Sequence, residues 1–252
     1  MRELERESSS DIPACTRLAL VGQGRVGTAL ARALEAAGID VTGPFGRGAD
    51  GADADAVLLC VPDGEIARAA GLISAGRLVG HCSGARGLDV LAPHEAFSLH
   101  PLMTVTRAEA DFNGAGAAIA GSTPAALRLA AELATRLGMR SVQVADEDRA
   151  LYHAAASIAS NFLVTVEAAA ERLMGRAGVE RALLVPLVRA SVENWAAAGA
   201  AQALTGPVAR GDEATVQAQR AAISEREPEF LELFDALVTA TRRLSRPQGV
   251  AA

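Results

Sequence analysis

The feature that most constrains the fold of this chain is a glycine-rich turn that follows its first apolar segment. A short apolar run over residues 17–21 leads directly into the sequence Gly22-Gln-Gly-Arg-Val-Gly27, and a helical pattern follows over residues 28–37. A strand, a G-x-G-x-x-G turn and a helix in this order are typical of the first βαβ unit of a dinucleotide-binding domain. The turn alone would be a weak indication because glycine is common, but its position between a strand and a helix favours a nucleotide site.

Each glycine of the turn has its own expected role. Gly22 permits the tight turn, Gly24 lets the backbone approach a pyrophosphate, and Gly27 lets the helix pack closely on the strand. The start of the helix then offers free N–H groups and the positive end of its dipole to the phosphates. The residues between the glycines are candidates for the same contacts, namely Gln23, Arg25 and Val26. The alternative is a glycine-rich turn that binds no ligand.

The second strand ends without the acidic residue that usually selects NAD. In NAD sites an Asp or Glu about 20 residues after the turn binds the ribose hydroxyls. Here the stretch from Thr42 to Arg47 contains no carboxylate and ends in an arginine. Because a guanidinium can bind a 2′-phosphate through two parallel charge-assisted hydrogen bonds, Arg47 favours NADP. The alternative is that Arg47 is a solvated loop residue.

Apolar runs and helical patterns alternate through the first half of the chain. This alternation predicts an α/β domain, a doubly wound and mostly parallel sheet of the Rossmann kind. The expected strands are 17–21, one that starts at 41, 56–61, 78–81, 96–99, 115–120 and 141–144, and a further helix is expected over 124–137.

The pattern changes at Asp146, from where Ala, Leu, Glu and Arg recur at helical spacing, so an all-α second domain is predicted. Its expected helices are 147–174, 180–197, 213–224 and 228–244. We therefore expect a disordered tail over residues 1–15, an NADP-binding Rossmann domain over 16–145 and a helical domain for substrate binding and dimerisation over 146–252.

Several residues are expected at the carboxyl ends of the strands, where ligands bind in open α/β sheets. Val61 ends the expected third strand, Pro62 follows it and Ser83 follows the fourth, so these three are expected beside the cofactor. His100, at the end of the fifth strand, is a candidate proton donor because the pKa of an unperturbed histidine lies near neutrality.

A polar stripe is expected at the start of the helical domain. His153, Ser157 and Asn161 follow one another at intervals of four, which places them on one face of a helix among alanines. Small neighbours would let a substrate approach, Ser157 and Asn161 could donate hydrogen bonds to a carbonyl, and His153 could supply a proton. The alternative is that His153 simply faces solvent.

A glycine-rich polar loop, residues 205–212, offers a second set of substrate contacts. Thr205 could line the substrate site, and Arg210 could bind a carboxylate. The alternative is an ordinary turn between helices, in which Arg210 pairs with Asp212.

Composition excludes several classes of function. The net charge is −6 without a basic run, which argues against a nucleic-acid partner. All 24 basic residues are arginines, which excludes a lysine acid or Schiff base. The three cysteines show no C-x-x-C spacing, so no metal site is expected. The N-terminus lacks a signal-peptide pattern and no apolar run approaches the roughly 18 residues of a membrane helix, so a cytoplasmic protein is predicted.

An ordered set of motifs extends through most of the chain, as part of a resemblance that covers residues 15 to about 245. They are residues 21–27, 81–84, 98–102, 152–156, 159–161 and 204–212. This set resembles a bacterial family that pairs a Rossmann-like domain with a helical domain of unknown function. The family is similar in layout to pyrroline-5-carboxylate reductases, ketopantoate reductases and β-hydroxyacid dehydrogenases.

The resemblance implies NADP(H), a substrate cleft between the domains and a homodimer built through the helical domain. One departure limits it. β-Hydroxyacid dehydrogenases and typical ketopantoate reductases use a helical lysine, commonly one turn before an Asn, whereas Ser157 stands four positions before Asn161 and the chain contains no lysine.

Two hypotheses follow. The first is an NADP(H)-dependent reductase of a small 2-oxo acid or imine, with ketopantoate the most specific candidate. The second is a non-catalytic module that senses NADP(H), a hypothesis motivated by the missing lysine. A less favoured possibility is that the first domain binds another nucleotide.

Overall fold

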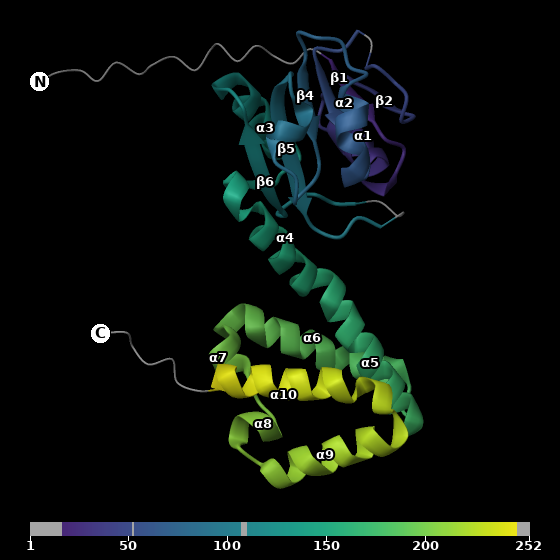
Figure 1. Cartoon of the computed structure of the whole chain (residues 1–252), viewed down its shortest axis with the longest axis vertical. Coiled ribbons are helices and arrows are strands. Elements are labelled where there is room, and N and C mark those ends of the chain that lie inside the picture. Colours follow the sequence, from purple (N-terminus) through teal and green to yellow (C-terminus); the bar gives the residue numbers. More distant parts are fainter. Residues whose placement is uncertain (1–16, 52, 107–109, 246–252) are drawn as a thin grey trace, which may run out of the picture. The chain divides into compact units, whose positions relative to one another are not determined.

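The computed structural model describes residues 17–51, 53–106 and 110–245 (Figure 1). The chain divides into two compact units at Ser160/Asn161. The domain boundary expected after residue 145 stays a prediction, and the predicted N-terminal tail lies outside the described residues.

The first unit is built on one seven-stranded sheet with the strand order β2-β1-β3-β4-β5-β6-β7. The strands are β1 Leu18–Val21, β2 Val41–Phe45, β3 Ala56–Leu59, β4 Leu78–His81, β5 Glu95–Leu102, β6 Gly116–Gly121 and β7 Arg140–Gln143. Neighbouring strands pair in parallel except β5 and β6, which pair antiparallel. All seven expected strands and the mostly parallel sheet are confirmed.

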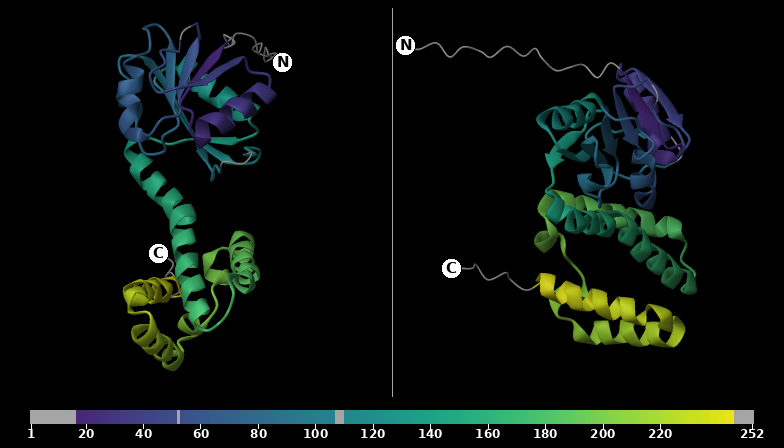
Figure 2. Two further views of the ribbon diagram at one scale, coloured as in Figure 1. Left: turned by 90° about the vertical axis from the view of Figure 1, so that its right-hand side faces the viewer. Right: turned by 45° about the horizontal axis from the view of Figure 1, so that its top comes forward.

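Helices cover both faces of this sheet, as can be followed in Figures 1 and 2. α1 (Arg25–Ala36) and α3 (Pro124–Arg136) share one apolar cluster with β1, β3, β5 and β6. α2 (Ile66–Ala70) and the 3-10 turn η2 (Leu88–Leu91) cover the other face. α1 buries Gly27, Leu30, Ala31 and Leu34, a spacing of three or four residues that turns one face to the sheet. The short 3-10 turn η1 (Asp63–Glu65) precedes α2.

The helical part begins with the 3-10 turn η3 (Asp146–Asp148) and α4 (Arg149–Ser157), both in the first unit. A π-helical stretch, η4 (Ile158–Phe162), separates α4 from α5 (Leu163–Arg176). The expected helix over 147–174 is therefore present, but it is not uniformly α-helical.

The remaining elements belong to the second unit. They are α6 Arg181–Ala198, α7 Ala200–Ala203, α8 Pro207–Arg210, α9 Glu213–Arg226, η5 Pro228–Phe230 and α10 Leu231–Ser245. The helices expected at 180–197, 213–224 and 228–244 are confirmed. The expected loop 205–212 contains the single turn α8. Within the described residues, no helix is long and apolar enough to cross a membrane.

The apolar core is distributed unevenly between the units. Both clusters of buried apolar side chains lie in the first unit. In the second unit the buried apolar residues are few and mostly small or β-branched, namely Ala169, Leu184, Val216, Ile223 and Val238. Several of its large apolar side chains are more than half exposed, namely Phe162, Val164, Leu183, Leu187 and Trp195.

Candidate nucleotide-binding and active site

The glycine turn is fixed by the close approach of backbone atoms. Gly22 has φ +122°, and a Cβ there would lie 2.2 Å from the carbonyl oxygen of Cys60 at the end of β3. A Cβ on Gly27 would lie 2.0 Å from the carbonyl oxygen of Gly22. Side chains at these two positions would therefore collide with backbone. At Gly24, by contrast, a Cβ would meet no atom within 4 Å.

The open side of the turn carries the features of an anion site. Gly24 is the N-cap of α1, and because glycine has no side chain, no cap side chain occupies the N–H groups at the helix start. Gln23, Gly24 and Arg25 are exposed, whereas Val26 packs against the core. The N–H groups of the first turn of α1 and the positive end of its dipole therefore meet open space.

The turn lies at the switch point of the sheet. β1 pairs with β2 on one side and with β3 on the other, so the chain reverses its direction of winding there. In doubly wound sheets the ligand binds at such a point, beyond the carboxyl ends of the strands. The place and geometry of the turn both fit a nucleotide pyrophosphate.

Arg47 follows β2 and is exposed. The pKa of Glu65 is lowered mainly by its hydrogen bond with Arg68, and the charge of Arg47 contributes to this shift. Arg47 thus stands near η1, on the side of the glycine turn where β2 ends. Its guanidinium is accessible to a ligand.

The other predicted cofactor contacts differ in their surroundings. Val61 is partly buried against the second core cluster, and Pro62 is exposed. Ser83 is 7% exposed, and its Oγ accepts hydrogen bonds from the backbone N–H groups of Ala85 and Arg86. The Ser83 hydroxyl oxygen therefore holds its own loop, a role the sequence did not indicate.

A polar cluster lies just beyond the end of β4, where β5 continues, so that His100 lies within β5 rather than at its expected end. Nδ1 of His100 is 2.9 Å from the hydroxyl oxygen of Tyr152, and the two rings are nearly perpendicular. The ring of His153 lies 6.2 Å from that of His100, centroid to centroid. The structure thus brings together the two histidines that were predicted separately, and it adds Tyr152 from the same helix, α4.

Burial favours the neutral forms of His81, the last residue of β4, and His100 of β5. Burial is the main cause that lowers the pKa of His100 to about 4, and electrostatic interactions with His153 and Arg149 act in the same direction. The pKa of His81 is also lowered, again mainly by burial. Nδ1 of His81 accepts a hydrogen bond from the Ser83 N–H, and its Nε2 is then free to donate to the carbonyl of Gly87 at 3.0 Å. Both imidazoles are therefore neutral near pH 7.

Arg149 is a functional candidate that the sequence reasoning missed. Its side chain is almost fully buried; Nη2 donates to Ser98 Oγ at 2.8 Å and Nε donates to Asp146 Oδ1 at 2.9 Å. Its Nη1 is buried with no hydrogen-bond partner among the described residues. The run of charged residues at 146–149 indicated only a helix start, and the signal that could have distinguished Arg149 is its position one helical turn before His153.

The predicted polar stripe is interrupted. His153 and Ser157 belong to α4, whereas Asn161 lies in the π-helical stretch η4 and in the second unit. An α-helical spacing of four residues therefore does not continue from Ser157 to Asn161, because a π-turn rotates each residue by a smaller angle. His153 and Asn161 are exposed and Ser157 is partly buried.

Thr205 and Arg210 lie in the second unit and are both exposed. Asp212 caps α9 by accepting hydrogen bonds from Thr215, and these bonds are the main reason why its pKa is lowered. The charge of Arg210 adds to that shift. The local contacts thus include the interaction between Arg210 and Asp212 that the turn interpretation expected.

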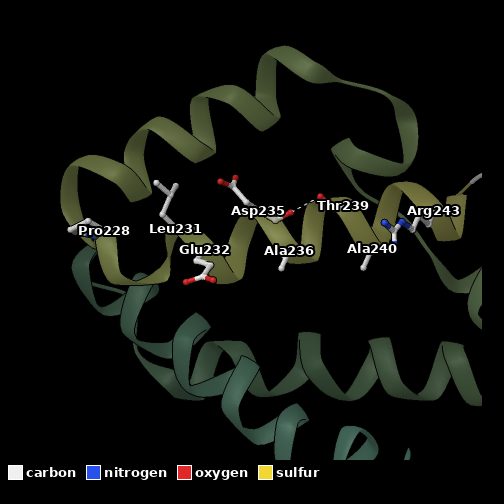
Figure 3. A pocket seen from close by; sticks show the side chains of 8 residues that line it. All are labelled: Pro228, Leu231, Glu232, Asp235, Ala236, Thr239, Ala240 and Arg243. Carbon is white, nitrogen blue, oxygen red and sulfur yellow. Dashed lines mark hydrogen bonds between the residues drawn. The ribbon is translucent and has the colours of Figure 1, made fainter.

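A hollow in the second unit contains none of the predicted site residues. It follows one face of α10 (Figure 3) and is lined by Pro228, Leu231, Glu232, Asp235, Ala236, Thr239, Ala240 and Arg243. Asp235 is paired with Arg220 through two short contacts. Among the described residues, no group of three or more His, Cys, Asp or Glu side chains could hold a metal ion.

Comparison with known proteins identifies a family and a fold. The family described as "Domain of unknown function (DUF2520)" matches residues 115–241, about half of the chain. No curated protein matches the chain in sequence.

Many solved structures resemble the chain, and three of them are described here. A Bacteroides fragilis protein, provisionally described as an NADP oxidoreductase, has a TM-score of 0.78 at 21% identity and covers 90% of this chain and 98% of its own. The reductive aminase of Aspergillus terreus in complex with NADPH and ethyl levulinate has a TM-score of 0.67 at 16% identity, with coverage of 90% and 94%. 1-Pyrroline-5-carboxylate reductase of Streptococcus pyogenes has a TM-score of 0.59 at 11% identity, with coverage of 90% and 98%. These similarities confirm the expected Rossmann-like fold with a helical C-terminal part.

Proposed function

The chain belongs to the DUF2520 family, and on that premise we propose that it is an NADP(H)-dependent oxidoreductase. The observation that carries the proposal is the glycine turn, whose closed side is packed against backbone and whose open side presents the start of α1. Two proteins of similar fold support it, because one is provisionally described as an NADP oxidoreductase and the other was solved with NADPH.

The residues present fit the cofactor. Gly22 and Gly27 hold the turn in a shape that side chains would disrupt, and Gly24 leaves room for the pyrophosphate. Arg47 binds the 2′-phosphate through its guanidinium. Gln23, Arg25, Val26, Val61, Pro62 and Ser83 complete the proposed contacts with the cofactor. NADPH supplies a hydride when it is bound.

The proposed substrate is a small 2-oxo acid or imine, with ketopantoate the most specific candidate, and the proposed location is cytoplasmic. His153 and His100 are the candidate proton donors that the sequence named. Ser157 and Asn161 orient the substrate carbonyl in this proposal. The remaining contacts assigned to the substrate are Thr205 and, for a carboxylate, Arg210.

A titration followed by a turnover assay tests the proposal. Purified protein is titrated with NADPH and NADH, and NADPH oxidation is then followed with ketopantoate and pyrroline-5-carboxylate. Tighter binding of NADPH than NADH, with turnover of one substrate, supports the reductase. Binding without turnover favours the non-catalytic NADP(H)-sensing module, and absence of binding refutes both.

Arg47→Asp tests the cofactor preference. It should weaken NADPH binding by about tenfold or more, because a charge-assisted hydrogen bond is worth about 1.5–3 kcal/mol, and it should shift preference towards NADH. Arg32→Asp is the matched control, since Arg32 is exposed in the second half of α1 and makes the same change of charge. Equal effects of the two variants would refute a 2′-phosphate contact at Arg47.

A homodimer is part of the proposal. The second unit has few buried apolar residues, while Leu183, Leu187 and Trp195 of α6 are each more than half exposed. Soluble monomers rarely expose large apolar patches, and obligate homodimer interfaces resemble a core divided between two chains. A second copy of this chain can bury such a surface through a self-complementary contact.

A further inference from the structure

We propose that Tyr152 is the proton donor of the reduction and that His100 and Arg149 position it and stabilise its anion. The inference rests on the proposed oxidoreductase function and names a catalytic residue that the sequence did not single out.

A hydrogen-bond contact between Tyr152 and His100 links α4 to the sheet. Tyr152 comes from α4 and His100 from β5, two residues past Ser98, which pairs with the last residue of β4. Their contact of 2.9 Å joins the helix to the sheet just beyond the carboxyl end of β4, and ligands bind beyond strand ends in this class of sheet. The His100 ring lies against Gly84, where a Cβ would be only 2.8 Å from the ring. The ring is thereby held in one place, and Tyr152 is partly exposed, so its hydroxyl can meet a ligand.

At neutral pH, Tyr152 rather than His100 carries the proton that can be donated. His100 is neutral there, because burial, His153 and Arg149 lower its pKa to about 4, with His81 acting in the same direction and Asp63 opposing. An imidazolium at this position is therefore too rare to act as the acid. Burial raises the pKa of Tyr152, so its hydroxyl keeps its proton until a substrate requires it.

A buried positive charge, that of Arg149, acts on both members of this pair. Arg149 is 1% exposed, is held by Ser98 and Asp146, and has Nη1 without a partner among the described residues. Its positive charge opposes the rise in the pKa of Tyr152. A buried cation that favours the phenolate stabilises the charge that develops when Tyr152 gives up its proton.

The proposed reduction uses one hydride from NADPH and one proton from Tyr152. The hydride of NADPH forms the new C–H bond at the carbonyl or imine carbon, and the π electron pair of the C=O or C=N bond moves to the heteroatom. That atom takes the proton of Tyr152, and the electron pair of the broken O–H bond stays on the phenolate oxygen. His100, with its proton on Nδ1, donates a hydrogen bond to that oxygen. A proton from the solvent then restores the Tyr152 hydroxyl, so the net reaction consumes NADPH and one solvent proton and gives the reduced substrate and NADP⁺.

One test needs no substrate, because Tyr152 is the only tyrosine in the chain. Tyrosinate absorbance after a rapid pH jump therefore reports this one hydroxyl, before alkaline unfolding. Arg149→Gln should move the titration to higher pH, and Arg149→Lys should restore it by keeping the charge. Arg128→Gln, on the exposed face of α3, should leave it unchanged. An unchanged titration in Arg149→Gln overturns the proposal.

A second test uses turnover and separates this inference from the proposed function. Tyr152→Phe should lower reduction of ketopantoate by about 10²–10⁴-fold while the Kd for NADPH is unchanged. Reduction of a quaternary cyclic iminium salt, which accepts hydride without a proton, should be spared. Full turnover of ketopantoate by Tyr152→Phe overturns the donor role. If the wild-type protein does not bind NADPH, the oxidoreductase proposal fails instead, and the absorbance titration still decides whether Arg149 stabilises the phenolate.

Discussion

Replacement of Gly24 by serine separates the stability of the glycine turn from its capacity to bind a phosphate. Gly24 has φ −74° and ψ −178° at the N-cap of α1, a conformation that serine adopts readily, and a Cβ there meets no protein atom within 4 Å. Serine is also a favoured N-cap, so Gly24→Ser should leave the free energy of unfolding unchanged or raise it by a few tenths of a kcal/mol. The added atoms would occupy the space proposed for the pyrophosphate. Crowding of this kind costs about 1–3 kcal/mol, which corresponds to a loss of roughly 5- to 150-fold in NADPH affinity.

The assay combines urea unfolding without ligand and fluorescence titration with NADPH, and Gly27→Ala is the matched comparison. A Cβ on Gly27 would lie 2.0 Å from the carbonyl oxygen of Gly22, so this variant should lose both stability and affinity. We therefore expect Gly24→Ser to lose affinity for NADPH without losing stability, in contrast to Gly27→Ala. Gly24→Ser protein that keeps the wild-type Kd for NADPH would show that no phosphate approaches this part of the turn.

Three further predictions concern other parts of the molecule. The pKa of His100 is lowered from 6.5 to about 4, so the unfolded chain binds a proton at this residue before the folded chain does as the pH falls. The free energy of unfolding should therefore rise by about 3 kcal/mol from pH 4 to pH 6.5. In urea unfolding His100→Gln should show a smaller rise with pH than the wild-type protein, and an equal rise in both would contradict the prediction. The pKa of the Cys82 thiol is raised by its hydrogen bond with Cys60, whose sulfur is 3.6 Å away, and by burial. Mass spectrometry should therefore show slow alkylation of Cys82 by iodoacetamide at neutral pH. Rapid alkylation would contradict the raised pKa. In sedimentation velocity, Trp195→Glu should convert the proposed homodimer to a monomer. The control Arg243→Glu, on α10, should remain a dimer. A wild-type protein that sediments as a monomer would refute the dimer.

Local sequence patterns predicted most of the secondary structure. Several strands were recognisable because they are short apolar runs that end near Gly or Pro, as β3 does before Pro62. α2, with only five residues, is too short to show a helical period, and it was missed. The π-helical stretch Ile158–Phe162 has no signature in the sequence, so the spacing of His153, Ser157 and Asn161 was taken as regular.

The candidate site could be predicted only where its contacts are local in sequence. The turn at Gly22–Gly27 has a steric requirement that is present in six consecutive residues. The polar cluster depends instead on contacts between residues far apart in the chain: Arg149 bonds to Ser98 across 51 positions, and Tyr152 bonds to His100 across 52. Hydrophobic periodicity does not report such pairs, so Arg149 was interpreted as part of a helix start.

The glycine turn and the polar cluster should respond differently to substitutions. The turn depends on backbone atoms, so a substitution there acts through collision and affects binding whatever the pH. The polar cluster depends on charge and burial, because the neutral His100 and the charged, buried Arg149 act together on a single hydroxyl. Changes in the cluster should therefore alter proton transfer and its pH dependence while NADPH affinity is preserved. Independent responses of affinity and proton transfer are what a site composed of a phosphate-binding turn and a separate acid requires.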